Sequence, residues 1–127
     1  MNDVLLVDDD PDFMRMCRLL LVTQGLTITC AVSGEEALQE LRGDSFRLTI
    51  TDYHLPEMNG LILSKHMCSI APGMPIIMVT GSMTPELSYE AKSVGISTVL
   101  AKPFFPDTLL NEVGKLLEVQ LDFSNQQ

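Results

Sequence analysis

Residues Val4 to Asp10 read Val-Leu-Leu-Val-Asp-Asp-Asp, a short apolar run that ends in three carboxylates. Its length and its branched side chains are typical of a buried β-strand. Three later apolar runs also lead into a polar residue: Phe46–Thr51 into Asp52, Pro75–Val79 into Thr80, and Ser97–Ala101 into Lys102. The sequence therefore predicts strands whose ends carry carboxylates, a hydroxyl and an ammonium group.

Segments with helical periodicity separate these runs, and each begins at a helix-start signal. The predicted starts are Pro11 after Asp10, the capping box of Ser33 with Glu36, Asn59, Thr84 with Pro85, and Pro106. A further strand is predicted over Leu26–Val32, where polar and apolar residues alternate as in an edge strand. The alternation of strands and helices predicts an α/β fold, a parallel sheet with helices on both faces. Right-handed crossovers then bring the carboxyl ends of the strands to one edge, where such folds bind ligands.

The chain has 127 residues, of which 46% are hydrophobic, so we expect one domain with a conventional core. Its net charge of −9 disfavours direct binding to nucleic acid or to anionic membrane surfaces. The N-terminal apolar run is too short for a signal peptide or a membrane span, so we expect a cytoplasmic protein. Cys17, Cys30 and Cys68 are odd in number and lie in apolar patterns, which predicts buried, reduced thiols.

Asp8 and Asp9 follow the first strand and Asp52 follows the third, so a shared edge gathers like charges. Two such charges about 4 Å apart repel by about 1 kcal/mol in water and about 4 kcal/mol at an intermediate dielectric. A hard divalent cation relieves this repulsion, and Mg²⁺ binds one or two carboxylates together with water and a phosphate oxygen. The pattern predicts a Mg²⁺ site and requires the first and third strands to be neighbours. Asp10 is expected to cap the following helix.

Asp52 is the candidate nucleophile, because a carboxylate can form an acyl phosphate. Phosphoryl transfer needs mainly positioning and charge neutralisation from the protein. The ammonium of Lys102 and the hydroxyl of Thr80 suit phosphoryl oxygens, and Gly81 leaves an adjacent backbone N–H accessible. Neither a lone lysine nor a lone threonine is informative, whereas the combination is specific.

The chain from about Asp3 to Leu121 resembles the receiver domain of a two-component response regulator. The features that carry the resemblance are the acidic pair Asp8 and Asp9, the acceptor Asp52 followed by Pro56 and Gly60, the hydroxyl of Thr80, and the signature Lys102-Pro103-Phe104. The resemblance implies the flavodoxin-like, doubly wound sheet of five parallel strands in the order 2-1-3-4-5. It also implies that the main-chain carbonyl of His54 completes the Mg²⁺ site and that the Lys102–Pro103 bond is cis.

In function, the resemblance implies a phosphorylation-switched signalling domain rather than an enzyme with a substrate of its own. A sensor histidine kinase or a phosphotransfer protein would donate to Asp52, and the domain would assist this transfer and its own dephosphorylation. Phosphorylation would switch binding to a downstream effector or to a second copy in a dimer. The switch positions are Thr80 and the residue three before the lysine; the family usually has an aromatic residue there, and this chain has Val99. With Val99 at this position, the sequence does not tell whether the usual coupling between the threonine and the aromatic residue is kept.

Two other interpretations stay open. A phosphatase of the haloacid dehalogenase type also uses Mg²⁺ and an aspartyl phosphate, with Asp8 as its nucleophile, although it expects Thr or Val in place of Asp12. The second alternative is a receiver-like scaffold that binds partners without phosphorylation. The sequence identifies neither the kinase nor the downstream target, and we expect Asp122 to Gln127 to form a polar C-terminal tail.

Overall fold

The computed structural model describes residues 2–121, which form five strands and five helices in alternation. The strands are β1 (Asn2–Val7), β2 (Ile28–Ala31), β3 (Phe46–Asp52), β4 (Ile76–Thr80) and β5 (Thr98–Ala101). The helices are α1 (Pro11–Val22), α2 (Gly34–Gly43), α3 (Gly60–Ile70), α4 (Pro85–Ser93) and α5 (Pro106–Leu117). Within residues 2–121, each helix is too short or too polar to cross a membrane. The predicted tail, Asp122 to Gln127, lies outside the described residues.

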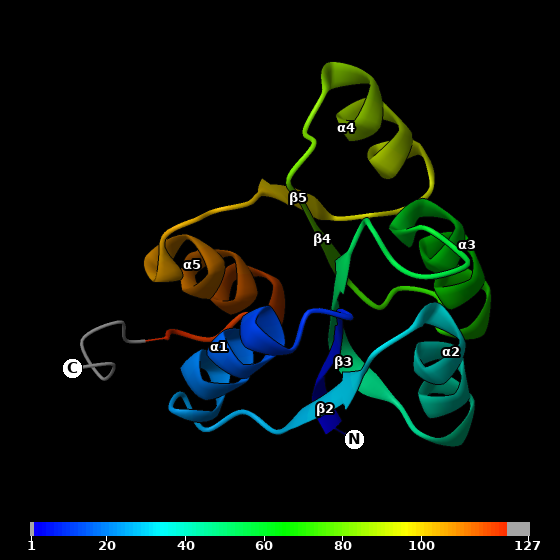
Figure 1. The fold of residues 1–127 in the computed structure, drawn as a ribbon. Helices are drawn as coiled ribbons and strands as arrows, with labels where there is room; N and C mark the ends of the chain where they lie inside the picture. The colour runs from blue at the N-terminus through cyan, green and yellow to red at the C-terminus, as the bar shows by residue number, and fades with distance from the viewer. Residues whose placement is uncertain (1, 122–127) are drawn as a thin grey trace.

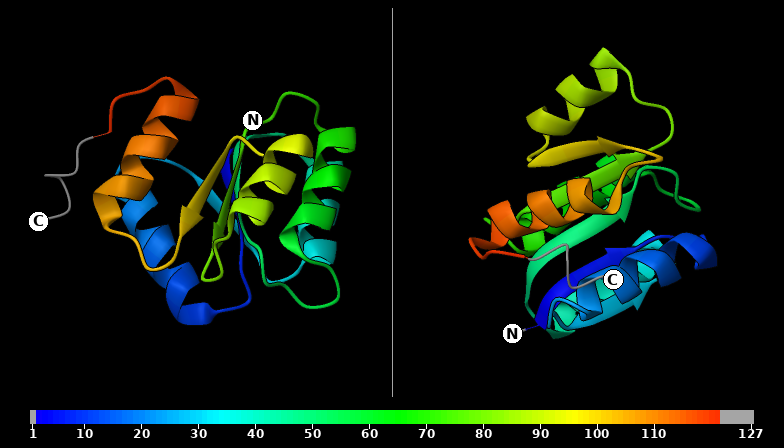
Figure 2. Two further views of the ribbon diagram at one scale, coloured as in Figure 1. Left: turned by 90° about the horizontal axis from the view of Figure 1, so that it is seen from above. Right: turned by 90° about the vertical axis from the view of Figure 1, so that its left-hand side faces the viewer.

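The strands form one parallel sheet in the order β2-β1-β3-β4-β5, which confirms the predicted topology. β2 and β5 lie at opposite ends of the sheet in Figure 1, and the arrows run the same way in Figure 2. β1 and β3 are adjacent, as a shared site for Asp8 and Asp52 requires, and Val7 is paired with Thr51. β2 is an outer strand, as its alternating pattern predicts, although it spans only four residues.

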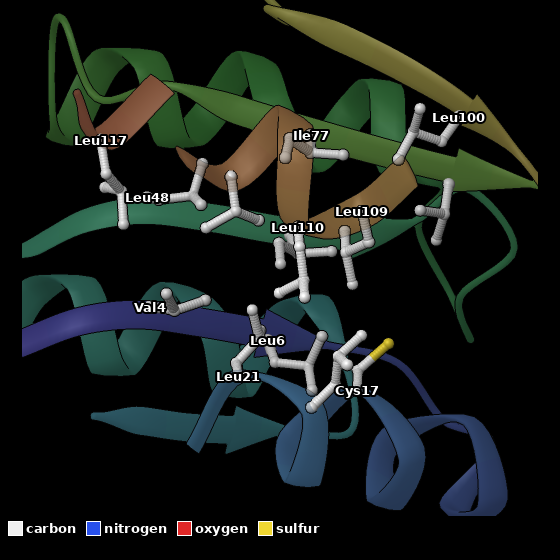
Figure 3. Packing of buried hydrophobic residues seen from close by; sticks show 14 of the residues in the cluster. Val4, Leu6, Cys17, Leu21, Leu48, Ile77, Leu100, Leu109, Leu110 and Leu117 are labelled. Atoms are coloured by element: carbon white, nitrogen blue, oxygen red, sulfur yellow. The ribbon is translucent and has the colours of Figure 1, made fainter. Parts of the chain in front are cut away.

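Helices cover both faces of the sheet. α1 and α5 pack on one face, and α2, α3 and α4 lie on the other (Figure 1; Figure 2, left). Figure 3 shows the core on the side of α1 and α5, where Leu6, Leu48 and Ile77 of neighbouring strands meet Leu21 and Leu110 of the helices. Burying a side chain of this size contributes about 1.5–3 kcal/mol. This packing holds the strand ends, and the side chains that follow them, in fixed relative positions.

Polar side chains begin the first four helices, as the sequence predicts. The capping residues, each of which accepts a backbone N–H of the first turn, are Asp10, Ser33, Asn59 and Thr84. Such a cap stabilises a helix by about 1 kcal/mol. The predicted capping box is formed in part: Ser33 Oγ accepts the N–H of Glu36 (3.2 Å), and the Glu36 carboxylate accepts the N–H of Val32 (3.2 Å), one residue before the expected donor.

The prediction of buried thiols is correct for Cys17 but wrong for Cys30. Cys17 is fully buried on α1, Cys68 is half-buried on α3, and Cys30 is exposed. Cys30 lies on β2, which has a neighbouring strand on one side only. Its side chain therefore lacks the cover that side chains of the central strands receive.

Candidate functional site

The carboxyl ends of the strands bring the predicted site residues to one edge of the sheet. Asp52 is the last residue of β3, and Asp8 and Asp9 follow β1 directly. Thr80 is the last residue of β4, and Lys102 follows β5. The N–H of Lys102 donates to the main-chain oxygen of Thr80 (2.8 Å), which ties the last two strand ends together. Parallel pairing thus assembles residues that are far apart in the chain.

Three carboxylates meet at this edge. Asp8, Asp9 and Asp52 each offer an oxygen, and these oxygens lie within 4.8 Å of one another. Asp8 is fully buried and Asp52 is only 6% exposed, whereas Asp9 is open to solvent. Oδ1 of Asp52 is buried and has no hydrogen-bond partner among residues 2–121. An unpaired acceptor beside further carboxylates is the donor set that a hard divalent cation binds, so the residues present fit Mg²⁺.

Asp8 is the deepest charged group of the site. The N–H of Asp10 donates to its Oδ1 (2.8 Å), and Lys102 Nζ lies 3.1 Å from its Oδ2. Burial raises the pKa of Asp8 above its ordinary value, and the neighbouring Asp52 charge acts in the same direction. The hydrogen bond from Asp10 and the Lys102 ammonium offset part of this rise. Ionised Asp8 is therefore in an environment that favours additional positive charge.

Lys102 bridges the two buried carboxylates. Its Nζ lies 3.1 Å from Oδ2 of Asp8 and 3.5 Å from Oδ2 of Asp52. The same Nζ lies 3.9 Å from the centroid of the Phe13 ring. Phe13 was not among the predicted site residues, because its spacing on α1 is that of an ordinary core position. No local sequence signal distinguishes it, since the contact depends on tertiary structure.

Thr80 lies at the end of a strand that is buried throughout, and its Oγ1 accepts the N–H of Ser82 (3.0 Å). The hydroxyl therefore keeps its proton for another acceptor. Gly81 is exposed, and a Cβ built there would meet no atom within 4 Å. The structure gives no steric reason for glycine at this position, and the role of the Gly81 N–H stays a prediction.

The loop between β3 and α3 carries His54, whose side chain is exposed and packs edge-on against Tyr53 (ring centroids 4.9 Å apart, 85°). Gly60 closes this loop, and its N–H donates to the main-chain oxygen of Tyr53 (2.8 Å). A Cβ at Gly60 would lie 2.7 Å from the main-chain oxygen of Asp52, closer than real Cβ atoms come. Glycine at this position lets α3 start directly against the end of β3.

The β5 end shows two further predicted features. The Lys102–Pro103 peptide bond is cis, which confirms the prediction. Val99 is half-buried and is paired with Met78 of β4. It packs against the core on the side of α2, α3 and α4. Unlike the aromatic residue usual at this position, it has no large side chain that could change orientation.

Comparisons with known proteins agree with this geometry. The family model described as "Response regulator receiver domain" matches residues 4–114. The transcriptional regulatory protein GlrR of Escherichia coli is 33% identical over 115 residues, which is 91% of this chain but only 26% of GlrR. The response regulator receiver protein CpdR of Brucella abortus is 32% identical over 117 residues, which covers 92% of this chain and 98% of that protein.

Solved structures give the same result. A CheY-like response regulator receiver domain protein of Methanospirillum hungatei superposes with a TM-score of 0.88 at 30% identity, over 93% of this chain and 94% of that one. The chemotaxis response regulator CheY4 of Vibrio cholerae has a TM-score of 0.85 at 34% identity, over 91% and 98%. These matches do not favour the phosphatase or the scaffold interpretation. The chain belongs to the response regulator receiver domain family, the phosphoacceptor signalling domains of two-component systems.

Proposed function

We propose that Asp52 is the phosphoacceptor and that a sensor histidine kinase or a phosphotransfer protein donates to it. The observation that carries this proposal is the buried Oδ1 of Asp52, which has no hydrogen-bond partner in the described part of the chain. It lies beside the other acidic groups, and the Lys102 ammonium is 3.5 Å from the other oxygen of the same carboxylate. An acceptor needs a free oxygen lone pair, and a site for phosphoryl needs nearby positive charge. Both conditions are met at Asp52.

The proposed cofactor is Mg²⁺. Its ligands would be the carboxylates of Asp8, Asp9 and Asp52 together with the main-chain carbonyl of His54. When bound, the cation supplies charge neutralisation for the phosphoryl oxygens. The carboxylates are already close together in this structure, so binding requires little rearrangement of the chain.

In the proposed transfer, an Asp52 carboxylate oxygen forms a bond to phosphorus while the P–N bond to the donor histidine breaks. The histidine nitrogen leaves with the electron pair of that bond. The Lys102 ammonium balances charge on one phosphoryl oxygen, and the Thr80 hydroxyl and the Gly81 N–H donate hydrogen bonds to others. The same groups would assist hydrolysis of the acyl phosphate, in which water supplies the attacking oxygen.

The proposed output is a change in partner binding at the surface beyond β4 and β5. Thr80 would move toward the phosphoryl group, and Val99, which is paired with Met78 two residues before Thr80, would respond to this movement through packing alone. The partner would be a downstream effector or a second copy in a phosphorylation-dependent dimer. A cytoplasmic location is part of this proposal.

The proposal is tested by phosphorylation with acetyl phosphate and Mg²⁺, followed by intact mass spectrometry. We expect one added phosphoryl group, none in Asp52→Asn, and none in the wild type after chelation of Mg²⁺. Asp12→Asn is the matched control, because Asp12 is an exposed carboxylate on α1 outside the acidic cluster. Unchanged labelling of Asp52→Asn contradicts the proposal. Hydrolysis of phosphate monoesters that depends on Asp8 but not on Asp52 would favour the phosphatase instead.

A further inference from the structure

The Lys102 ammonium has contacts of two chemical kinds. Two are carboxylates, Asp8 at 3.1 Å and Asp52 at 3.5 Å. The third is the face of the Phe13 ring, whose centroid lies 3.9 Å from Nζ. A cation at this distance over an aromatic face is attracted by the negative charge density of the ring.

The Phe13 ring is held in place independently of the lysine. It forms a T-shaped contact with the ring of Phe104, with the centroids 5.9 Å apart and the planes at 86°. Both phenylalanines also pack against the core between the sheet and the helices α1 and α5. Because Phe104 follows Lys102 by two residues, the same loop carries the ammonium and the support of the ring that faces it.

The carboxylates and the ring differ in what they can bind. Asp8 and Asp52 are proposed ligands of the divalent cation, so the ammonium shares these partners with a competitor of the same sign. A phenyl ring offers no oxygen to Mg²⁺. The contact with Phe13 therefore involves no atom that the cation would bind, whereas the contacts with Asp8 and Asp52 involve carboxylates that it would share.

We propose that Phe13 is a positioning residue that holds the Lys102 ammonium at the strand ends, ready to meet a phosphoryl group. This inference rests on the proposed role of Lys102. A free lysine side chain has large rotamer entropy, which must be lost each time the ammonium meets the phosphoryl oxygens. A ring that already confines the ammonium removes part of this loss before transfer begins.

Replacing the ring is expected to slow phosphoryl transfer to Asp52. A partly desolvated cation–π contact corresponds to a factor of about five, within a range of roughly two to thirty. Lys102 is 23% exposed at its side chain, which places the contact between the exposed and the desolvated limits. Phe13→Leu should therefore be slower by about this factor, and Phe13→Tyr, which keeps the aromatic face, should remain near the wild-type rate.

The experiment combines the initial rate of labelling by acetyl phosphate with the proton NMR shift of the Lys102 ε-methylene. The face of an aromatic ring shields these protons, so Phe13→Leu should move them downfield and Phe13→Tyr should not. Met16→Leu is the matched control, because Met16, like Phe13, lies on α1 and lines the same surface cavity, which Lys102 also lines. Backbone amide spectra establish that each variant is folded.

A slower rate together with a lost ring shift in Phe13→Leu alone supports the inference. A rate equal to that of Met16→Leu, a faster rate, or an unchanged ε-methylene shift overturns it. Failure of the wild-type chain to label at Asp52 would instead overturn the proposed function on which the inference rests.

Discussion

Gly60 allows α3 to begin directly against the end of β3, so Gly60→Ala tests how tightly the acceptor strand is held. The added Cβ would lie 2.7 Å from the main-chain oxygen of Asp52, 3.0 Å from Cα of Tyr53 and 3.2 Å from the sulfur of Met78. Ordinary van der Waals contact begins at 3.4 Å. Two of the three neighbours are backbone atoms, so the start of α3 must move by several tenths of an ångström.

Overpacking of this kind costs about 1–3 kcal/mol. With a urea dependence of about 2 kcal/mol per molar for a domain of this size, the unfolding midpoint of Gly60→Ala should fall by roughly 1 M. The same movement shifts the Asp52 peptide group, so we also expect slower labelling by acetyl phosphate. Equilibrium urea unfolding monitored by circular dichroism measures the first effect, and intact mass against time measures the second.

Gly43→Ala provides the matched control. Gly43 is the last residue of α2, and a Cβ there would meet no atom within 4 Å. Alanine at this helical position should raise the free energy of unfolding by about 0.5–1 kcal/mol. Equal unfolding midpoints for Gly60→Ala and Gly43→Ala would refute the reasoning, because only the Cβ at position 60 is predicted to meet close neighbours.

Three further predictions concern charge and thiol reactivity. Burial raises the folded-state pKa of Asp8 above its unfolded value near 3.8, so the ionised carboxylate destabilises the fold once the pH exceeds the folded-state pKa. In the absence of divalent cations, Asp8→Asn should therefore have a higher melting temperature than the wild type at neutral pH. This difference in melting temperature should disappear below pH 3.8. For Asp3, burial acts to raise the pKa, but the N–H of Thr27 and further hydrogen bonds lower it overall. Asp3→Asn should therefore lower the free energy of unfolding in urea by about 1 kcal/mol at neutral pH. It should have no effect once the pH falls below the folded-state pKa. Iodoacetamide should modify exposed Cys30 first, whereas Cys17, whose pKa burial raises to about 12, should react only on unfolding, as peptide mass mapping would reveal. A destabilised Asp8→Asn, a pH-independent Asp3→Asn, or equal modification of the two thiols would contradict the respective statement.

The topology and the positions of the strand ends follow from the sequence because they depend on local patterns. The apolar run before Asp52 has the length and composition of a central strand, and the structure places β3 in the middle of the sheet. The requirement that Asp8 and Asp52 share a cation predicts the adjacency of β1 and β3, which parallel pairing confirms. Helix starts were predictable for the same reason, since a cap such as Asn59 acts within a few residues.

Features that depend on tertiary contacts were not predictable. The position of Phe13 on α1 gives no hint that its ring faces an ammonium on a loop near the other end of the chain. Cys30 is exposed although Ala31, the next residue of the same outer strand, is fully buried, so the exposure depends on how the helices cover each side chain of β2. The absence of a hydrogen-bond partner for Oδ1 of Asp52 within residues 2–121 likewise depends on where several surrounding elements end.

Both rims of the sheet are short. β2 and β5 span four residues each, whereas the central β3 spans seven. An outer strand presents unpaired N–H and C=O groups that can template the addition of a foreign strand, and the number of such groups grows with strand length. Because β2 and β5 are short, each edge of the sheet has few unpaired backbone groups, so edge-to-edge aggregation is disfavoured. Association with other proteins is thereby left to helices and loops, whose side chains can distinguish one partner from another.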